Sequence, residues 1–274
     1  MGSIGTPPPP LDVQGAFPEF AGRWRTTVRL HPRRAEPGVR DSSLGGPLLW
    51  PADEAWPVCT SEEDHDEPIG MVPVLQIFAR EVPEPAFPAG TDVLQLLWCP
   101  ALHDDDCRTL PLVRWRTEAA LGELLDNPGP PDDDDVEDGH VPAACAVSPE
   151  RVRELPQAWE LDDDLRDRVQ AWAQERGWSY FAHLSVAGGT KVGGWPEWIQ
   201  DPQWPVCDCG TTMSHLLTVS SAEWDGESWR RWSPAGTPAG GRDAGLCLGD
   251  VGANYFFTCP RCPGEPPTMV FQCS

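Results

Sequence analysis

Four segments alternate apolar and polar residues in the way that half-buried β-strands do. Residues 71–78 (MVPVLQIF) and 213–220 (MSHLLTVS) resemble each other, as do residues 92–100 (DVLQLLWCP) and 252–260 (GANYFFTCP). Because successive side chains of a strand point to opposite faces, this pattern predicts strands that pack one face against a core. Each half of the chain is therefore expected to contain a sheet.

Two further segments have the spacing of helices. Residues 117–126 carry three leucines on one side and stop before Asn-Pro-Gly, and residues 162–176 begin with acids and end at Arg-Gly. In the second segment Leu165, Val169 and Trp172 recur at helical spacing, which predicts a stripe packed on the core. Between the two segments, residues 127–142 combine Pro and Gly with a run of acids, which predicts a solvated loop.

The two halves share a longer motif. Residues 45–59 (GGPLLWPADEAWPVC) and 193–207 (GGWPEWIQDPQWPVC) align without a gap and are identical at eight of fifteen positions. The same order follows in each half, with a strand, a loop and a second strand that ends in Cys-Pro. Repetition of this kind indicates an internal duplication, although two similar Trp/Pro-rich loops without a common architecture are the alternative.

These patterns predict a β-rich α+β fold, built from two similar sheet-containing halves with a helical and acidic connector. The expected organisation is a Pro-rich N-terminal segment over residues 1–22, a first repeat over 23–116, the connector over 117–177, and a second repeat over 178–274.

Composition adds constraints on fold and partner. The 274 residues include 32 Pro and 14 Trp, and this much dispersed proline favours short strands and long loops over helical bundles. A formal charge of −23 argues against nucleic acid or an anionic membrane as a partner and favours a basic protein. No apolar run is long enough to span a bilayer and no signal peptide is visible, so a cytoplasmic location is expected. Ten cysteines there would be thiols or metal ligands.

The second repeat has the ligand spacing of a structural zinc site. Zinc takes four soft ligands arranged tetrahedrally, often as two closely spaced pairs. The C-x-C pair and the C-x-x-C pair that fit this pattern are Cys207, Cys209, Cys259 and Cys262. Gly210 can take a positive φ that turns backbone N–H groups towards the sulfurs. Cys273 is the expected substitute if the first pair supplies one sulfur only.

The first repeat keeps part of the same site. Cys59 aligns with Cys207, Cys99 aligns with Cys259, and His103 stands near the position of Cys262. These three residues predict a second metal site, whose fourth ligand would be His65 or Cys107. The alternative is a decayed site of buried cysteines with a surface histidine, because no cysteine matches Cys209 beside Cys59.

Redox and hydrolytic chemistry are poorly supported. Pro263-Gly264 follows Cys262 and cannot begin the helix that activates a thioredoxin-type cysteine. The His-x-Glu at His65 lacks the nearby Pro-Cys-x-x-Cys of a zinc deaminase. Nucleophile-elbow, metalloprotease and phosphate-loop motifs are also missing from the sequence.

The Gly-Gly-x-x-x-Trp segments, the Trp-Pro-Val-Cys motifs, the paired strands and the C-terminal Phe271-Gln272-Cys273 resemble the YwqG-like family, a bacterial domain of unknown function. The Pro, Trp and Asp content is similar to its actinobacterial branch. The resemblance runs from about residue 23 to the end and implies a β-rich α+β fold made by duplication. The segment KVGGWP at 191–196, with Cys207, Cys209 and Cys259-Pro260, is distantly similar to the programmed-cell-death-2 proteins, which are duplicated chaperones of a ribosomal protein.

The expected function is a non-catalytic, zinc-stabilised protein-binding module. Its acidic surface and exposed tryptophans, with Trp224, Trp229 and Trp232 as candidates, would engage a basic protein, as a dedicated chaperone or a toxin-neutralising immunity protein does. The alternative is a metal-dependent enzyme or small-molecule binder that uses the cleft between the repeats.

Overall fold

The computed structural model describes residues 5–61, 63–103, 108–132, 134–234 and 241–274. Over these ranges the chain is β-rich with few helices, and its strands form two six-stranded sheets and a two-stranded ribbon. The strands are β1 (Arg25–Arg29), β2 (Arg33–Arg34), β3 (Ser43–Leu44), β4 (Val58–Cys59), β5 (Ile69–Gly70), β6 (Val72–Phe78), β7 (Val93–His103), β8 (Arg108–Arg116), β9 (Cys145–Ala146), β10 (Glu150–Glu154), β11 (Lys191–Gly193), β12 (Ser214–Ser220), β13 (Ala253–Thr258) and β14 (Thr268–Gln272).

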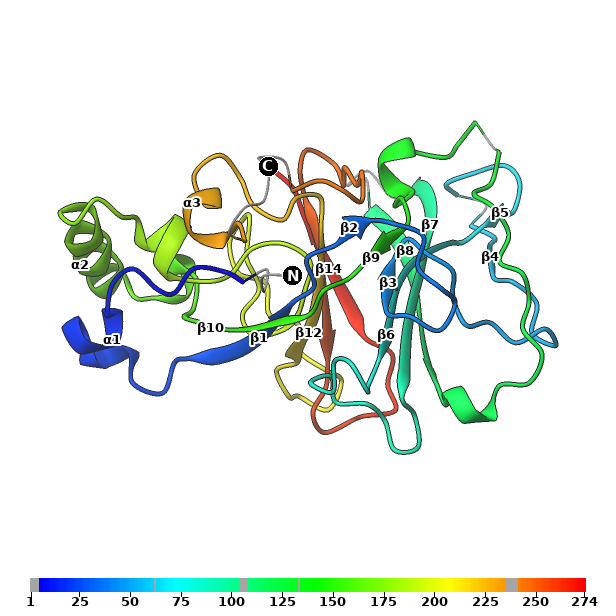
Figure 1. Cartoon of the computed structure of the whole chain (residues 1–274), viewed down its shortest axis with the longest axis horizontal. Coiled ribbons are helices and arrows are strands. Elements are labelled where there is room, and N and C mark those ends of the chain that lie inside the picture. The colour runs from blue at the N-terminus through cyan, green and yellow to red at the C-terminus, as the bar shows by residue number, and fades with distance from the viewer. Residues whose placement is uncertain (1–4, 62, 104–107, 133, 235–240) are drawn as a thin grey trace.

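Short helices occupy the ends of the connections. The α-helices are α1 (Val13–Ala16), α2 (Asp163–Gln174) and α3 (Trp229–Trp232). The other helical segments are the 3-10 helices Pro18–Phe20, Glu118–Ala120, Asp138–His140 and Ala158–Glu160 and the π-helix Tyr180–Leu184. Figure 1 shows α1 and α2 at one end of the long axis, the β4–β5 ribbon at the other, and the two large sheets between them.

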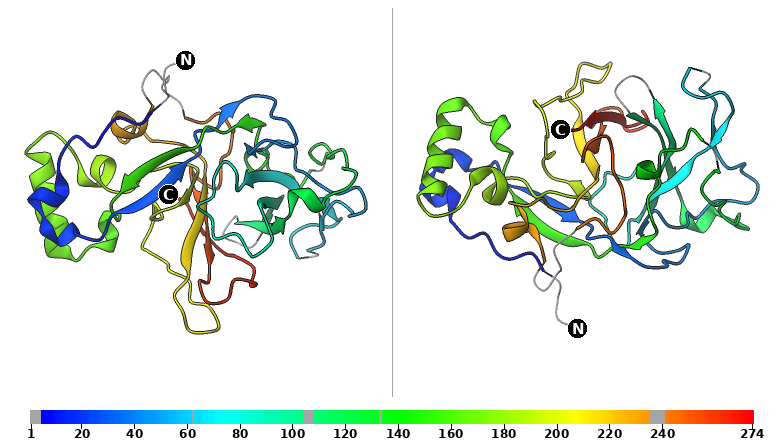
Figure 2. Two further views of the ribbon diagram at one scale, coloured as in Figure 1. Left: turned by 60° about the horizontal axis from the view of Figure 1, so that its bottom comes forward. Right: turned by 90° about the horizontal axis from the view of Figure 1, so that it is seen from above.

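Each large sheet contains one strand from the other half of the chain. Sheet A has the order β10-β1-β11-β12-β13-β14, and sheet B has the order β2-β9-β3-β6-β7-β8. In sheet A, β1 lies between β10 and β11, whereas in sheet B, β9 lies between β2 and β3. The continuous segments β1–β2 and β9–β10 thus connect the sheets, as the views in Figure 2 show.

The four predicted strands are confirmed as β6, β7, β12 and β13. The expectation that they are half-buried is wrong, because a core covers each face and nearly every residue of these strands is buried. The strand pairs β6–β7 and β12–β13 share an irregularity in their register. In each pair one residue of the first strand has no partner in the second; it lies between Pro73 and Leu75 in β6 and between His215 and Leu217 in β12. A bulge of this kind bends and twists a strand locally.

One predicted helix is confirmed and the other is wrong. Asp162 caps α2 by accepting a hydrogen bond from the Leu165 backbone N–H at 3.0 Å. In residues 117–126 only Glu118–Ala120 is helical. The rest of that segment runs along residues 50–52, where the Leu125 N–H donates to the Trp50 carbonyl at 2.9 Å. Its leucines reach the core from an extended backbone, so tertiary pairing overrides their helical spacing.

The acidic loop is solvated only in part. His140, near its end, is buried, its Nδ1 lies 3.1 Å from the Pro100 carbonyl, and its own carbonyl accepts the indole N–H of Trp98 at 2.7 Å. The prediction of a solvated loop is therefore wrong for the described residues at the C-terminal end of 127–142.

The two sheets share one core and each has a smaller core on its outer face. The shared core takes alternate residues of the long strands, including Leu96 and Trp98 of β7 and Phe256 of β13. The outer cores then collect the intervening residues of those strands. One contains Trp50, Met71, Cys59 and Cys99, and the other contains the aligned residues Trp198, Met213, Cys207 and Cys259. Two predicted metal ligands thus lie in each outer core.

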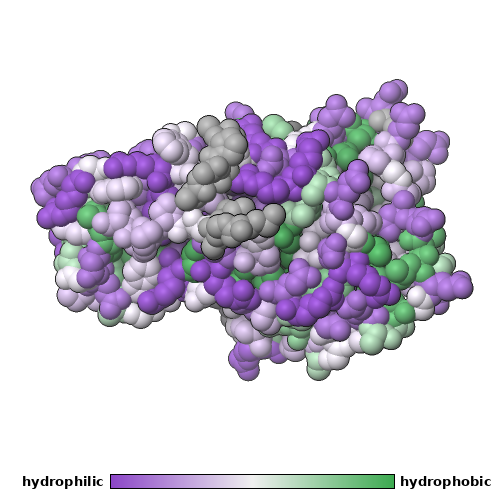
Figure 3. Space-filling model, viewed as in Figure 1, coloured by the Kyte–Doolittle hydropathy of each residue, from purple (hydrophilic) through white to green (hydrophobic). Residues whose placement is uncertain are grey.

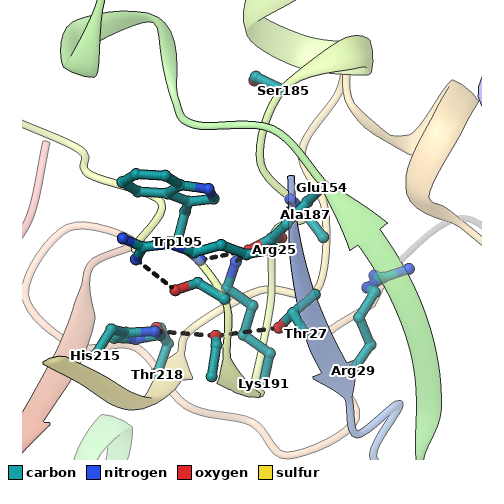
Figure 4. A network of polar contacts seen from close by, with 12 residues as sticks. Arg25, Thr27, Arg29, Glu154, Ser185, Ala187, Lys191, Trp195, His215 and Thr218 are labelled. Atoms are coloured by element: carbon teal, nitrogen blue, oxygen red, sulfur yellow. Dashed lines mark hydrogen bonds and ion pairs between the residues drawn. The ribbon is translucent and has the colours of Figure 1, made fainter. Parts of the chain in front are cut away.

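The second Gly-Gly segment, Gly193-Gly194, passes close to a buried carboxylate, that of Glu154. Glu154 is fully buried and accepts hydrogen bonds from Lys191 Nζ at 3.0 and 3.2 Å and from the backbone N–H groups of Ala187 and Trp195 at 2.8 and 2.5 Å (Figure 4). Gly194 has a φ of 74°, and a Cβ there would lie 2.1 Å from a Glu154 carboxylate oxygen. Only glycine fits this close approach.

Candidate metal centres

The first cysteine pair of the second half lies in a tight turn. The turn lies between Val206 and Thr212, which pair as an isolated β-bridge. Within it, the Cys207 N–H donates to the Thr211 carbonyl at 3.0 Å. The Gly210 N–H donates to the Cys207 carbonyl at 2.7 Å, and Gly210 has the positive φ that the sequence predicted, 80°. This turn holds both Cys207 and Cys209 towards the end of β13.

The second pair completes a cluster of four sulfurs. Cys259 follows β13 directly, and the Cys262 N–H donates to the Cys259 carbonyl at 3.3 Å in the next turn. In this four-cysteine group (Cys207, Cys209, Cys259 and Cys262) the Sγ atoms all lie within 4.8 Å of one another, and those of Cys209 and Cys259 are 3.6 Å apart. Ligands at about 2.3 Å from a tetrahedral zinc would be roughly 3.8 Å apart. The geometry therefore fits a metal ion.

The thiols of the four-cysteine group differ in acidity. The pKa of Cys209 is lowered to about 6, chiefly because the Thr211 hydroxyl and backbone N–H stabilise its thiolate. The pKa of Cys262 is raised to about 12, mainly because its thiol hydrogen-bonds to the sulfurs of Cys209 and Cys207, which favours the protonated form. A cation bound among the four sulfurs would favour all of the thiolates, so metal binding would release protons.

A second group of ligand atoms lies on the outer face of sheet B. Cys59 belongs to β4, Cys99 and His103 belong to β7, and His65 lies in the loop between β4 and β5. All four side chains of this cysteine–histidine group are buried, and their ligand atoms lie within 4.8 Å of one another. The structure therefore brings the three predicted residues together and adds His65 as the fourth.

Both histidines present the same ring nitrogen to the centre of the group. His65 Nε2 lies 3.9 Å from Cys99 Sγ, and His103 Nε2 lies 3.9 Å from Cys59 Sγ. On the other side of each ring, His103 Nδ1 lies 2.7 Å from an Asp64 carboxylate oxygen and His65 Nδ1 lies 2.7 Å from the backbone carbonyl two residues later. An acceptor on Nδ1 places the proton there and leaves Nε2 free to bind a metal.

Burial is the largest influence on the acidity of Cys99. It raises the pKa of Cys99 to about 12, with the nearby Cys59 as a smaller cause. A thiolate at this position therefore needs a compensating cation, because a buried charge without a partner is costly. Two thiolates and two neutral imidazoles around a divalent ion would leave the group neutral overall.

The remaining cysteine predictions have different outcomes. Cys107 lies outside the described residues. Cys273 is not a member of either ligand group; its side chain lies against Gly249 and Gly252 near the C-terminus. The missing counterpart of Cys209 is supplied by His65, six residues after Cys59. Its His-x-Glu context was visible in the sequence, but only the loop geometry selects it as a ligand.

The predicted tryptophan surface is mostly wrong. Trp232 is only 2% exposed and donates its indole N–H to the Ala182 carbonyl, and Trp224 is only 8% exposed beside Gly241. Trp229 is 54% exposed as predicted, and Trp159, which the sequence did not single out, is 45% exposed. Tryptophan rings can satisfy their N–H groups in a core, so frequency alone did not indicate which were exposed.

No known protein-family model matches this chain, and no curated protein matches it either. Among the described residues, the helices are all too short or too polar to cross a bilayer.

Proposed function

We propose that this protein is a non-catalytic binding module whose two halves are each stabilised by a zinc ion. The observation that carries the proposal is the pair of four-ligand groups, each on the outer face of one sheet, with donor atoms close enough for one ion. Four protein ligands leave no position for a reactive water, which is typical of structural rather than catalytic zinc.

Zinc is the metal that these donors favour. Four thiolates, or two thiolates with two imidazoles, are soft or borderline ligands at tetrahedral spacing, whereas calcium and magnesium take oxygen ligands. Such thiolate sites persist in a reducing compartment, which is consistent with a cytoplasmic location.

We also infer that the halves arose by duplication, as the YwqG-like resemblance implies. Three correspondences support this inference: the equivalent strand orders of the two sheets, the shared irregularity in β6 and β12, and the aligned Trp, Met and Cys residues of the outer cores. In this interpretation the cysteine–histidine group and the four-cysteine group are diverged versions of one ancestral site.

The proposed partner is a basic protein that contacts the helical end of the molecule. There an aromatic face, formed by Trp159, Phe181, Trp178 and Trp229, borders a pocket of about 660 Å³ between α2 and α3. The neighbouring α2 carries three highly exposed aspartates, Asp163, Asp164 and Asp167, which outnumber the two arginines, Arg166 and Arg168, that pair with them. Exposed aromatic side chains beside negative charge suit a cationic protein surface. The face shown in Figure 3 is mostly hydrophilic, with small hydrophobic patches.

Metal analysis tests the zinc half of the proposal. Purified protein is expected to contain two zinc ions per chain, and X-ray absorption should give an average shell of three sulfurs and one nitrogen. Cys259→Ser should lower the content to one zinc, while Cys247→Ser, an exposed cysteine outside both groups, should keep two. An oxygen ligand in the average shell would instead favour the metal-dependent enzyme.

Co-purification from the native host, read by mass spectrometry, tests the partner half. We expect a basic protein whose recovery falls with added salt and falls in Trp229→Ala, because exposed charges are screened and an aromatic anchor is lost. Leu110→Ala, which removes an exposed side chain from β8, is the matched control. Equal recovery of all proteins from the variant and the wild type would contradict this surface.

A further inference from the structure

A pocket lies between the Pro-rich N-terminal segment and β10, the edge strand of sheet A. Its volume is about 630 Å³, which is within the range of small-molecule sites. Apolar groups line much of it, and its charged residues are mostly arginines; the lining residues are Thr6, Pro7, Pro8, Pro9, Pro10, Leu11, Asp12, Trp24, Glu150, Arg151, Val152, Arg153 and Arg231.

The lining includes a buried arginine with unsatisfied donors. Arg231 is 3% exposed, and its Nε and Nη1, which are both shielded from solvent, have no hydrogen-bond partner among the described residues. Its guanidinium carbon lies 4.1 Å from the Trp232 ring centroid, a contact that favours the cation but satisfies no N–H group. Buried N–H groups without acceptors are rare because each costs on the order of 1–3 kcal/mol.

A second buried guanidinium adds to the positive charge. Arg29 is fully buried; its Nη1 donates to Thr6 Oγ1 at 3.0 Å and to the Trp232 carbonyl at 2.5 Å, while its Nε has no partner in the described part of the chain. Burial and then the charge of Arg29 lower the pKa of Arg231 to about 10, so Arg231 remains a cation at neutral pH.

Carboxylates offset part of this charge without accepting the free N–H groups of Arg231. Glu223, Glu150, Glu197 and Glu154 stabilise the Arg29 cation, and Glu150 also stabilises the Arg231 cation. Glu150 already accepts from the Thr6 N–H at 2.6 Å, from Thr6 Oγ1 at 2.5 Å, and lies 2.8 Å from His31 Nε2. Asp12 accepts the Gly15 N–H at 2.9 Å. Neither contact involves Arg231, and neither supplies an acceptor for its free N–H groups.

A third cation of the pocket lining, Arg153, lies over the ring of Trp24. The guanidinium carbon of Arg153 lies 4.9 Å from the Trp24 ring centroid, and no ion pair involving Arg153 occurs among the described residues. Arg151, in contrast, is held by Glu84, with its Nη2 3.1 Å from a carboxylate oxygen. Arg153 and Arg231 are therefore the arginines that line the pocket without an ion pair among the described residues.

We propose that this pocket binds a small organic anion, whose carboxylate or phosphate group contacts Arg231 and Arg153 and whose apolar body packs on Trp24 and the prolines. Planar guanidinium groups match both kinds of anion. The chain carries a formal charge of −23, but charges beyond about 8 Å are screened at physiological salt, so the local arginines set the preference. The proposal does not depend on the metal sites or on a protein partner.

Calorimetric titration of the full-length protein tests the proposal with four probes. Benzoate and phenyl phosphate contain both an anionic group and an apolar body, phenol lacks the charge, and inorganic phosphate lacks the apolar body. We expect one equivalent of benzoate or phenyl phosphate to bind and to bind more tightly than phenol or phosphate. Binding of phenyl phosphate alone identifies phosphate esters as the ligand class, and binding of benzoate alone identifies carboxylates.

Variants distinguish this pocket from other binding sites. Arg153→Gln is expected to weaken the preferred probe about tenfold or more, because it removes a charged contact. Arg231→Gln should abolish binding, and Arg114→Gln, which alters an exposed arginine of β8, should not change it. If Arg231→Gln does not fold, Arg153→Gln and Trp24→Leu still decide the question. Absence of 1:1 binding to either anion, or equal affinity in wild type and Arg153→Gln, would overturn the proposal.

Discussion

At the scale of single residues, the histidines of the cysteine–histidine group show most directly how the surroundings prepare a ligand. The Nδ1 atoms of His65 and His103 each face an oxygen, so each Nε2 is presented to the sulfurs as an acceptor. Asp64 is itself held by the Ser61 hydroxyl at 2.5 Å. The orientation of the ligands is therefore built from short-range contacts within one loop.

Asp64→Asn should weaken zinc at this group by about 10- to 100-fold, because the carboxylate that orients His103 and increases its basicity is lost. Competition with a chromophoric chelator measures the two affinities separately. Asp66→Asn, an exposed aspartate of the same loop, is the control. Equal zinc affinities in Asp64→Asn and wild type would mean that the Asp64 carboxylate does not strengthen zinc binding through His103.

His215 should make the protein less stable in acid. Burial, and secondarily the charge of Lys191, lowers the pKa of His215 from 6.5 to about 3 in the folded protein. The unfolded state thus binds the proton more readily, so the stabilising contribution is complete above pH 6.5 and is lost as pH falls from about 6.5 to about 3.

The free energy of unfolding of wild type should therefore fall between pH 7 and pH 5 by about 1–2 kcal/mol more than that of His215→Gln. This magnitude follows from roughly 1.4 kcal/mol per pKa unit. Urea unfolding at both values measures the difference, and comparing the two proteins cancels any metal loss that they share. Parallel losses in wild type and variant would show that His215 does not contribute.

At the scale of elements, local preference explains α2 but not residues 117–126. Asp162 provides an N-cap and Leu165 and Val169 a buried stripe, so α2 has both local and tertiary support. Residues 117–126 have leucines at helical spacing, but their backbone pairs with residues 50–52 instead. A sequence pattern of apolar residues indicates burial more reliably than it indicates the backbone conformation that achieves it.

The buried Glu154–Lys191 ion pair connects β10 with β11 and with the segment after β11. Burial raises the pKa of Glu154 and lowers that of Lys191, and the attraction between the two groups opposes both shifts. Glu154 also accepts the backbone N–H of Ala187, before β11, and that of Trp195, directly after the Gly193-Gly194 pair. The carboxylate thereby connects β10, β11 and the segment after β11.

Lys191→Met should lower the free energy of unfolding by about 3–5 kcal/mol, because Glu154 is left buried without a counter-charge. Glu154→Gln in the same chain should restore part of this loss. Chemical denaturation measures both, and Arg168→Met, which breaks exposed ion pairs, should cost at most about 1 kcal/mol. A cost for Lys191→Met as small as that of the control would contradict a buried ion pair.

At the scale of the whole molecule, the sheets are not separable along the chain. The first strand of each half pairs inside the sheet of the other half, as β1 does with β10 and β11 and β9 does with β2 and β3. A shared core also takes side chains from both sheets. Each half is therefore incomplete by itself, although each has its own metal-ligand group.

Fragments 1–126 and 127–274 should accordingly remain unfolded when expressed alone, because each lacks a strand and one wall of the shared core. Co-expressed fragments should associate and recover a native near-UV circular dichroism spectrum with two zinc ions per complex. A dispersed amide spectrum from the isolated 127–274 fragment would contradict this dependence.

The sequence by itself was sufficient for the strands β6, β7, β12 and β13, for α2, and for seven of the eight ligand residues with His65 as a named alternative. These features follow from alternation, capping and ligand spacing, which are local properties or are repeated between the halves. Only the tertiary structure decided the exchange of β1 and β9 between the sheets, the choice of His65, the burial of Trp224 and Trp232, and the meeting of Arg231 with the N-terminal segment. Those outcomes depend on contacts between residues far apart in the chain, and the pattern of any one segment contains no information about which distant segment will cover it.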